Sequence, residues 1–336
     1  MLPEKIPFEV TLRCNCRCEM CRYHADDSPK HDFSEMSLDE IKLALTKINN
    51  YYRNNGKQLK IGLTGGEPLL RKDIDKIILI FKELSIPYDI VTNLSLANEK
   101  IINLFKDYPP YAINVSIDGV GEVHNKIRRA NIFEIVKLNL IAIKENLPSI
   151  PIQIDCTITN NNVGNLLDMA KFASDLKINL NIRHLTFITK NLLKLQQDFE
   201  LKHFNKIFNH DFNLYSLNRE NVIILKKEIS KIKEFALKQN NSKITFFPNL
   251  DKNLDNWYLN EEKQLSSSVC DPYKIRIKPN GDIVHCENYV YGNILNQDFD
   301  EILNSENTKK IVNIFSNNFM PFCNRCSVSF INYSEK

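Results

Sequence analysis

The sequence predicts an α/β protein built on a parallel sheet. Between residue 6 and about residue 189, short β-branched runs alternate with stretches whose apolar residues recur at three- and four-residue spacing. This alternation is typical of parallel βα units. Polar or glycine-containing motifs follow several of the strand-like runs, and such sheets bind ligands at the carboxyl ends of their strands. With 336 residues, 43% of them hydrophobic, the chain can form one large domain and a small one.

Six runs are predicted as strands, in the order PFEVTL, LKIGLT, YDIVTN, AINVSI, IPIQIDCTI and INLNIRHLTF. The intervening helices have one apolar face, as in Leu38, Ile41, Leu45 and Ile48. Residues 190–262 are richer in Leu, Lys, Asn and Phe and are predicted to be a helical insertion or bridge, with an amphipathic helix over 222–238. Residues 263–336 carry a hairpin, KIRIKPNGDIVHC, for which Asn280-Gly281 predicts a type I′ turn.

Charge and hydropathy exclude several classes of protein. The chain has 44 basic and 41 acidic side chains, interspersed, so no surface for nucleic acid or an acidic membrane is predicted. No apolar run approaches the roughly 20 residues that a membrane span needs. The N-terminus lacks the basic and apolar regions of a signal peptide. A cytoplasmic location is therefore expected.

The nine cysteines fall mainly into two groups. The first group is Cys14, Cys16, Cys18 and Cys21, and the second is Cys270, Cys286, Cys323 and Cys326. Only Cys156 stands apart from both groups. Because thiols in the cytosol are kept reduced, metal binding or catalysis is favoured over disulfides.

The first group has the spacing C-x-x-x-C-x-x-C at Cys14, Cys18 and Cys21. Three thiolates on one short loop can bind three corners of a cubane iron–sulfur cluster and leave the fourth iron without a protein ligand. An open metal position is a feature of catalytic metal sites. The alternative is a zinc site or structural knuckle formed by Cys16, Cys18 and Cys21. Under the cluster interpretation, Cys16 is not a ligand.

Three further motifs end the second, third and fourth predicted strands. They are Thr64-Gly65-Gly66-Glu67-Pro68, Thr92-Asn93 and Ser116-Ile117-Asp118-Gly119, the last followed by HNKIRRANIF. Glycine is scarce, with 9 residues against about 23 expected at ~7% usage. The adjacent Gly65 and Gly66 therefore mark backbone that tolerates no side chain and can approach a ligand, and Glu67 offers an acceptor for an ammonium group.

Over residues 6 to about 189, these motifs and their order resemble the radical S-adenosylmethionine (SAM) superfamily. The resemblance implies a partial (βα)6 barrel in which SAM binds the open iron of a [4Fe-4S] cluster. An electron from the reduced cluster, supplied by a donor such as flavodoxin or ferredoxin, would cleave SAM. The products would be methionine and a 5′-deoxyadenosyl radical, which abstracts hydrogen from a substrate.

The residues that the resemblance implies as SAM-binding are Gly65, Gly66, Glu67, Asn93, Ser116, Asp118 and Arg128. In the family, the GGEP loop contacts the SAM amino group, and the serine after the fourth strand lies near the methionyl or ribose groups. Arg128 is a candidate polar contact, and a solvated arginine at a helix start is its alternative.

The chain departs from the family pattern at three positions. Met20 stands where an aromatic residue is common, and Leu94 and Arg129 stand where glycine is usual. Because methionine is soft and apolar, Met20 can still cover a cluster.

Three residues on the fifth and sixth strands are weaker candidates. Cys156 is predicted either as a buried small side chain or as a catalytic hydrogen donor or substrate contact. Arg183 and His184 are candidates to face the mouth of the barrel, with a structural role as the alternative for His184.

The second cysteine group can ligate one cluster or, equally, one zinc ion by its spacing alone. Cys270 and Cys286 flank the hairpin, and Cys323 and Cys326 form a C-x-x-C motif. Together with the following GNI and the helix FDEILNSE, this layout resembles the SPASM/twitch extension of radical SAM enzymes. Four cysteines, rather than the seven of a full SPASM domain, imply one auxiliary [4Fe-4S] cluster.

The resemblance implies a radical SAM enzyme with three regions: a barrel over 1–189, a bridge over 190–262 and a twitch-like iron–sulfur domain over 263–336. The expected substrate is a peptide that is matured or modified. The alternative is oxidation or epimerisation of a sugar or aminocyclitol. Since the chain begins at its first strand, no leader-binding domain is expected. A non-enzymatic zinc or iron–sulfur scaffold is the remote alternative.

Overall fold

The computed structural model describes residues 2–23, 34–208, 216–238, 243–251, 253–260, 274–286, 289–318 and 320–326. Within these residues, ten strands form one sheet in the order β10-β9-β8-β1-β2-β3-β4-β5-β6-β7. The strands from β1 to β7 pair in parallel, and β8 pairs in parallel with β1. The hairpin strands β8, β9 and β10 are antiparallel to one another. The predicted α/β fold with a parallel barrel sheet is confirmed.

The strands are β1 Ile6–Glu9, β2 Ile61–Thr64, β3 Tyr88–Thr92, β4 Ile113–Ser116, β5 Ile152–Thr157, β6 Asn179–Arg183, β7 Ile244–Phe247, β8 Ile275–Ile277, β9 Asp282–His285 and β10 Tyr289–Asn293. The first six coincide with the six runs predicted from the sequence. The described parts of residues 190–262 contain three helices, given below, and also β7, which the sequence analysis did not identify. This strand extends the barrel sheet beyond β6.

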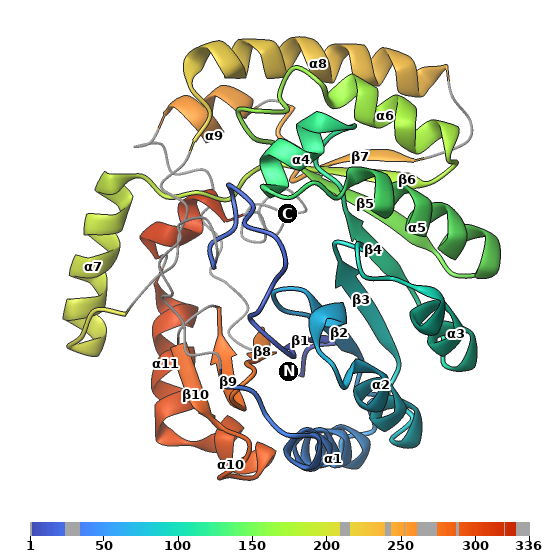
Figure 1. The fold of residues 1–336 in the computed structure, drawn as a ribbon. Coiled ribbons are helices and arrows are strands. Elements are labelled where there is room, and N and C mark those ends of the chain that lie inside the picture. Colours follow the sequence, from blue (N-terminus) through green and yellow to red (C-terminus); the bar gives the residue numbers. More distant parts are fainter. Residues whose placement is uncertain are drawn as a thin grey trace.

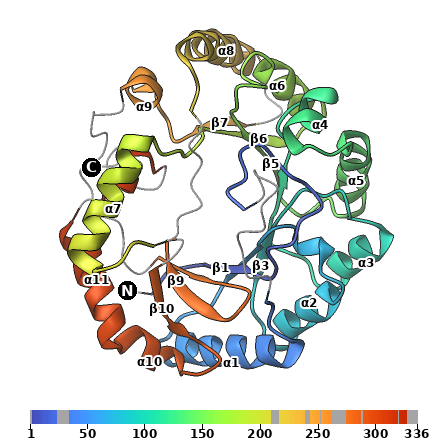
Figure 2. The same ribbon diagram turned by 60° about the vertical axis from the view of Figure 1, so that its left-hand side comes forward.

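The helices are α1 Leu38–Asn54, α2 Ile74–Glu83, α3 Glu99–Asp107, α4 Glu122–Arg128, α5 Phe133–Asn146, α6 Leu166–Asp175, α7 Lys190–Phe204, α8 Arg219–Leu237, α9 Leu254–Leu259, α10 Phe299–Asn304 and α11 Glu306–Asn317. Two 3₁₀ turns complete the set, η1 Pro68–Leu70 and η2 Pro321–Arg325. The helices form an outer ring around the curved sheet (Figure 1, Figure 2). No helix in the described ranges is long and apolar enough to cross a membrane.

Capping residues are found at the N-termini of several of these helices. Ser37 and Glu40 form a capping box at α1: the Glu40 amide donates to Ser37 Oγ at 3.3 Å, and the Ser37 amide donates to Glu40 Oε2 at 2.7 Å. The Asn98 side chain accepts from the Ile101 amide and begins α3. These caps satisfy backbone N–H groups that lack a partner inside the helix.

The turn between β8 and β9 differs from the predicted type I′ turn. The Gly281 amide donates to the carbonyl of Lys278, so the turn is centred on Pro279 and Asn280. Gly281 alone has a left-handed φ, of +87°. Because proline fixes φ at a negative value, the loop combines an ordinary turn with a glycine bulge.

The two faces of the sheet have opposite polarity. The side chains toward the helices are apolar and fully buried, as at Phe8, Leu63, Ile90, Val115 and Ile182. The residues that alternate with them form what we call the inner face, and it is largely polar. Register places on the inner face Glu9, Thr64, Val91, Ser116, Asp155, Thr157, Asn181, Arg183, Thr245 and Phe247. Since side chains alternate along a strand, the chain lines its barrel with groups that can bind a polar ligand.

Glu9, on the inner face of β1, connects the barrel to the C-terminal hairpin. Its carboxylate is buried and forms ion pairs with Arg276, with Lys278 at 3.0 Å and with Arg22 at 3.5 Å. Burial alone would raise the pKa of Glu9. The charges of Arg276, Lys278 and Arg22 outweigh burial and lower the pKa to about 2. The carboxylate is therefore ionised at neutral pH and attracts cations from β8 and from the loop after β1.

Glu9→Gln is expected to destabilise the protein by about 3 kcal/mol, because it removes the buried charge shared by three cations. Urea unfolding at pH 7.5 under anaerobic conditions measures the loss. Glu4→Gln is the matched control, since Glu4 pairs with Lys60 at 2.6 Å on the exposed surface and should leave the midpoint unchanged. Equal midpoints for wild type and Glu9→Gln would contradict the role of Glu9.

Candidate active site

The loop after β1 brings three cysteines of the first group into one cavity. Cys14, Cys18 and Cys21 line a cavity of about 210 Å³ at the carboxyl ends of the barrel strands. Cys16 is buried and is not part of its lining. The structure thus places the three cysteines of the C-x-x-x-C-x-x-C spacing around one cavity.

The paired glycines hold this cysteine loop against the barrel. The Gly66 amide donates to the carbonyl of Thr11 at 2.7 Å, and the Glu67 amide donates to the carbonyl of Arg13 at 2.9 Å. A Cβ on Gly65 would overlap the Thr11 carbonyl oxygen, and one on Gly66 would lie 2.6 Å from the Leu12 carbonyl oxygen. The glycines are therefore required by the approach of two backbone segments, in addition to any contact with a ligand.

The Glu67 carboxylate connects the loops that follow β2 and β3. It is buried and accepts from the Leu69 amide at 3.1 Å, the Thr92 hydroxyl at 2.6 Å and the Asn93 amide at 2.7 Å. Burial raises its pKa, while these hydrogen bonds act in the opposite direction. A carboxylate has about four acceptor sites, so one site is left for a ligand in the cavity.

Asn93 holds the cysteine loop from the third strand. Its side-chain amide donates to Asn15 Oδ1 at 2.8 Å and contacts the Cys16 sulfur at 3.6 Å. The next residue, Leu94, is buried with a left-handed φ of +63°. The chain therefore keeps the backbone conformation that a glycine adopts easily, although leucine occupies the position.

The end of α4 completes the support of the loop. The amides of Arg17 and Glu19 donate to the carbonyls of Arg128 and Ile127 at 3.1 and 3.0 Å. Arg129, the second position where glycine is usual in the family, also has a left-handed φ, of +50°. Leu94 and Arg129 thus both adopt a backbone conformation that favours glycine.

Arg128 and Asp118 form a buried ion pair beside the cysteines. The guanidinium lies 2.5 Å from Asp118 Oδ2 and contacts the Cys18 sulfur at 3.6 Å. A hydrogen bond with the Cys16 thiol lowers the pKa of Cys18 to about 6; burial opposes this shift and the charge of Arg128 adds to it. Because the thiolate is the form that binds metal, these residues fit an iron–sulfur cluster.

The predicted SAM-binding residues divide by position. Those that line the cavity with the cysteines are Gly65, Gly66, Glu67, Asn93, Ser116 and Arg128. Asp118 does not line it but pairs with Arg128 and accepts from the Thr157 amide at 2.8 Å. Thr157 also lines the cavity, and the sequence analysis did not select it.

Cys156 and His184 lie on the outer face of the sheet, away from this cavity. Cys156 neighbours Ile182 in register and is completely buried in the core. Its position fits the alternative of a buried small side chain and gives no support to a hydrogen donor. The ring of His184 contacts the Tyr258 hydroxyl at 3.0 Å, and burial lowers its pKa to about 3. Arg183, by contrast, lies on the inner face of the sheet, in register with Thr157.

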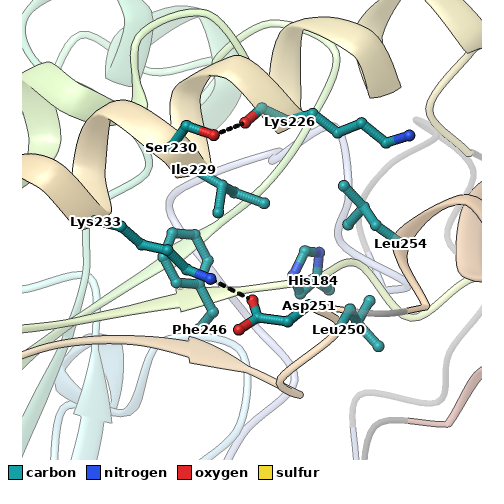
Figure 3. Close-up of a pocket in the computed structure, with 9 residues that line it drawn as sticks. All are labelled: His184, Lys226, Ile229, Ser230, Lys233, Phe246, Leu250, Asp251 and Leu254. Atoms are coloured by element: carbon teal, nitrogen blue, oxygen red, sulfur yellow. Dashed lines mark hydrogen bonds and ion pairs between the residues drawn. The ribbon is translucent and has the colours of Figure 1, made fainter.

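A second cavity, of about 240 Å³, lies outside the barrel between β7, α8 and α9. Figure 3 shows His184 and Phe246 on one side of it and the α8 residues on the other. Lys233 pairs with Asp251 at 2.8 Å across it. The other lysine of this cavity, Lys226, pairs with Asp255 at 2.6 Å. The sheet separates this cavity from the first cysteine group.

The second cysteine group is described in part. Cys270 lies outside the described residues. Burial and the hydrogen bond to Glu200 raise the pKa of Tyr289, and the charges of Cys286 and Cys323 raise it further. Within the described residues, no three His, Cys, Asp or Glu side chains are placed to hold a single metal ion.

Arg325, inside the C-x-x-C motif, fixes that motif to the rest of the protein. It is buried and donates to the carbonyls of Trp257 at 2.8 Å, Asn256 at 3.0 Å and Asn260 at 2.6 Å at the end of α9. The Trp257 indole in turn donates to the carbonyl of Leu185 after β6, at 3.2 Å. The sequence analysis missed Arg325; an arginine between two ligand cysteines was the available signal.

Gly66→Ala is expected to abolish cluster loading at the first cysteine group, because the added carbon displaces the backbone of the cysteine loop. Iron content after anaerobic reconstitution should fall from about eight to about four atoms per chain. Gly164→Ala is the control, since its Cβ would meet only the Ile224 side chain at 3.8 Å. Full iron content in Gly66→Ala would contradict the assigned contact.

Cysteine variants separate the two possible ligand sets. Cys14→Ala is expected to lose about four iron atoms per chain, whereas Cys16→Ala should keep about eight. Iron quantification together with the visible absorbance of the reconstituted protein measures both. If Cys16→Ala loses iron and Cys14→Ala keeps it, the ligand set is Cys16, Cys18 and Cys21.

Comparison with known proteins bears on both cysteine groups. A family model described as the radical SAM superfamily matches residues 8–173, and one described as an iron–sulfur cluster-binding domain, SPASM, matches residues 270–327. The chain is 30% identical over 218 residues to an uncharacterized protein of Methanocaldococcus jannaschii, covering 60% of this chain and 69% of that protein. It is 29% identical over 200 residues to a probable GTP 3′,8-cyclase of Methanococcus aeolicus, covering 58% and 64%.

Solved structures are similar over nearly the whole chain. Native anSMEcpe with bound AdoMet has a TM-score of 0.67 at 16% identity and covers 98% of this chain and 88% of its own. Streptococcus suis SuiB bound to S-adenosylmethionine has a TM-score of 0.64 at 15% identity and covers 100% and 75%. At these identities, the likeness establishes the fold.

The geometry of the site and the family matches agree with each other. The cysteines and the glycine-rich loop that line the barrel cavity lie within the radical SAM match, and the SPASM match follows it in the chain. The cofactors are a [4Fe-4S] cluster with SAM and iron–sulfur ligation in the C-terminal domain. The chain belongs to the radical SAM superfamily and is an enzyme of that superfamily with a C-terminal SPASM domain.

Proposed function

We propose that this enzyme reductively cleaves SAM and uses the resulting 5′-deoxyadenosyl radical to abstract hydrogen from a peptide. The observation that carries the proposal is the single cavity lined by Cys14, Cys18 and Cys21 together with the Gly65-Gly66-Glu67 loop. When bound, the cluster supplies the electron that breaks the sulfonium bond. A donor such as flavodoxin or ferredoxin reduces the protein.

The side chains around the cavity have distinct roles in this proposal. Glu67 keeps one acceptor site for the SAM ammonium group, because its three other sites accept protein donors. Ser116 and Asn93 provide polar contacts for the rest of the cofactor. Arg128 offers donors to its carboxylate, and Asp118 holds that guanidinium in place through the buried pair.

Similarity over both domains supports a peptide substrate. Streptococcus suis SuiB bound to precursor peptide SuiA has a TM-score of 0.60 and covers 98% of this chain. Native anSMEcpe with bound AdoMet and Cp18Cys peptide has a TM-score of 0.66 and also covers 98%. The match to the probable GTP 3′,8-cyclase covers only 58% of this chain.

In the C-terminal domain, we propose one auxiliary [4Fe-4S] cluster bound by Cys270, Cys286, Cys323 and Cys326. The match of an iron–sulfur cluster-binding domain to residues 270–327, which include all four cysteines, supports this. The auxiliary cluster would accept the electron of the product radical in an oxidation.

The proposal is tested by anaerobic reconstitution and dithionite reduction, with 5′-deoxyadenosine measured by mass spectrometry. Wild type should form 5′-deoxyadenosine from SAM, and Cys18→Ala should lose this activity to background because the cluster is absent. Deuterated peptide pools, sugars with aminocyclitols, and GTP are then compared as deuterium donors to 5′-deoxyadenosine. Transfer from peptides supports the proposal. Transfer only from sugars or only from GTP would replace the peptide with that substrate.

A further inference from the structure

Two charged residues on the inner face lie directly beside the SAM cavity, and the family motifs include neither of them. Asp155 on β5 is in register with Ser116 on β4, and Arg183 on β6 is in register with Thr157 on β5. Ser116 and Thr157 both line the cavity. Neighbouring residues in register on parallel strands point to the same face of the sheet. Asp155 and Arg183 therefore occupy the barrel wall next to the cofactor.

The two carboxylate oxygens of Asp155 differ in their hydrogen bonds. Its Oδ1 accepts from Gln153 Nε2 at 3.1 Å and from Asn181 Nδ2 at 2.8 Å. Its Oδ2 accepts no hydrogen bond from the described residues, and the side chain is 17% exposed. These two amides fix the carboxylate in position and leave Oδ2 as an acceptor.

Arg183 is held in place without using its hydrogen-bond donors. Its guanidinium lies 4.9 Å from the centre of the Phe247 ring and 3.8 Å from Asp155 Oδ1, which is too long for a hydrogen bond. Across the described ranges, it donates to no side chain or carbonyl, and 41% of the side chain is exposed. The planar guanidinium is thus a fork of donors on the inner face of the sheet.

The pair has no net charge, and this decides which ligand it suits. A phosphate at Arg183 would place its charge beside the Asp155 carboxylate, which is unfavourable. A group that both accepts and donates suits the two residues better. The C=O and N–H of one residue in an extended peptide provide this combination, because they point to the same side of the chain, as in the hydrogen-bonded pairs of a sheet.

We propose that Asp155 and Arg183 bind the main chain of an extended peptide substrate, with Arg183 donating to a carbonyl and Asp155 Oδ2 accepting from an amide N–H. This inference rests on the proposed peptide-modifying function. It assigns the pair as the subsite that holds one substrate residue beside Ser116 and Thr157, where the cofactor binds. Side-chain selectivity then comes from other residues, because main-chain contacts do not depend on the substrate's side chains.

The experiment is affinity selection of a pool of capped pentapeptides by the cluster-loaded protein with SAM, read by mass spectrometry. Capping removes the terminal charges, so that main-chain amides dominate recognition. Wild type should retain peptides, and retention should fall about tenfold in Arg183→Gln and in Asp155→Asn, since each variant removes one charge-assisted hydrogen bond. Asp155→Asn is nearly isosteric and can place an N–H donor where the Oδ2 acceptor stood. Iron content and the melting temperature verify that each variant is folded.

Lys226→Gln is the matched control. Lys226 is half-exposed and pairs with Asp255 at 2.6 Å on the outer helices, so its loss should leave peptide retention at the wild-type level. A pool of neutral sugars and aminocyclitols is screened in parallel. Retention of sugars in place of peptides, no peptide retention by wild type, or unchanged retention in both pair variants would each overturn the inference. SAM cleavage is measured separately: its absence refutes the proposed function, whereas cleavage without peptide retention refutes only this subsite.

Discussion

The contact between two backbone segments organises the whole site. The glycines at 65 and 66 let the loop after β2 lie directly on the carbonyl groups of Thr11, Leu12 and Arg13. No other residue type permits this approach, because a Cβ would occupy the space of a carbonyl oxygen. The start of the cysteine loop is fixed in this way, and Cys14 follows Arg13 directly. The remaining supports, from Glu67, Asn93 and the end of α4, act on a loop that is already positioned.

The alternation of the strands determines which side chains can take part in chemistry. Neighbouring residues at the ends of β5 and β6 point to opposite faces of the sheet. Thr157 and Arg183 lie on the inner face, whereas Cys156 and His184, the residue after β6, point toward the helices. A shift of one residue in register would exchange the two sets. The outer face supplies the apolar core that holds helices to sheet. The inner face remains free to present polar groups to a cofactor and a substrate.

The C-terminal domain is joined to the barrel by polar contacts that are buried in the protein. The pairing of β8 with β1 continues the sheet. Glu9 on β1 forms ion pairs with Arg276 and Lys278 in the hairpin and with Arg22 in the loop after β1. Arg325 joins the C-x-x-C motif to the carbonyl groups at the end of α9. A buried guanidinium needs such acceptors, since desolvation without them is costly. The cysteine loop after β1 and the C-x-x-C motif at Cys323 and Cys326 are therefore held by one continuous framework.

The six barrel strands, the hairpin and the grouping of cysteines were predictable from the sequence, because strand alternation, turn residues and ligand spacing are local patterns. It also predicted the loops that meet at the cavity, since parallel strands end at one edge. The fold was needed to choose between the alternatives for single side chains, such as Cys156 and His184, which both lie on the helix-facing side of the sheet. The sequence likewise did not reveal β7, the turn at Pro279, or the partners of Glu9 and Arg325. These depend on contacts between residues distant in the chain, where packing and burial outweigh local preference.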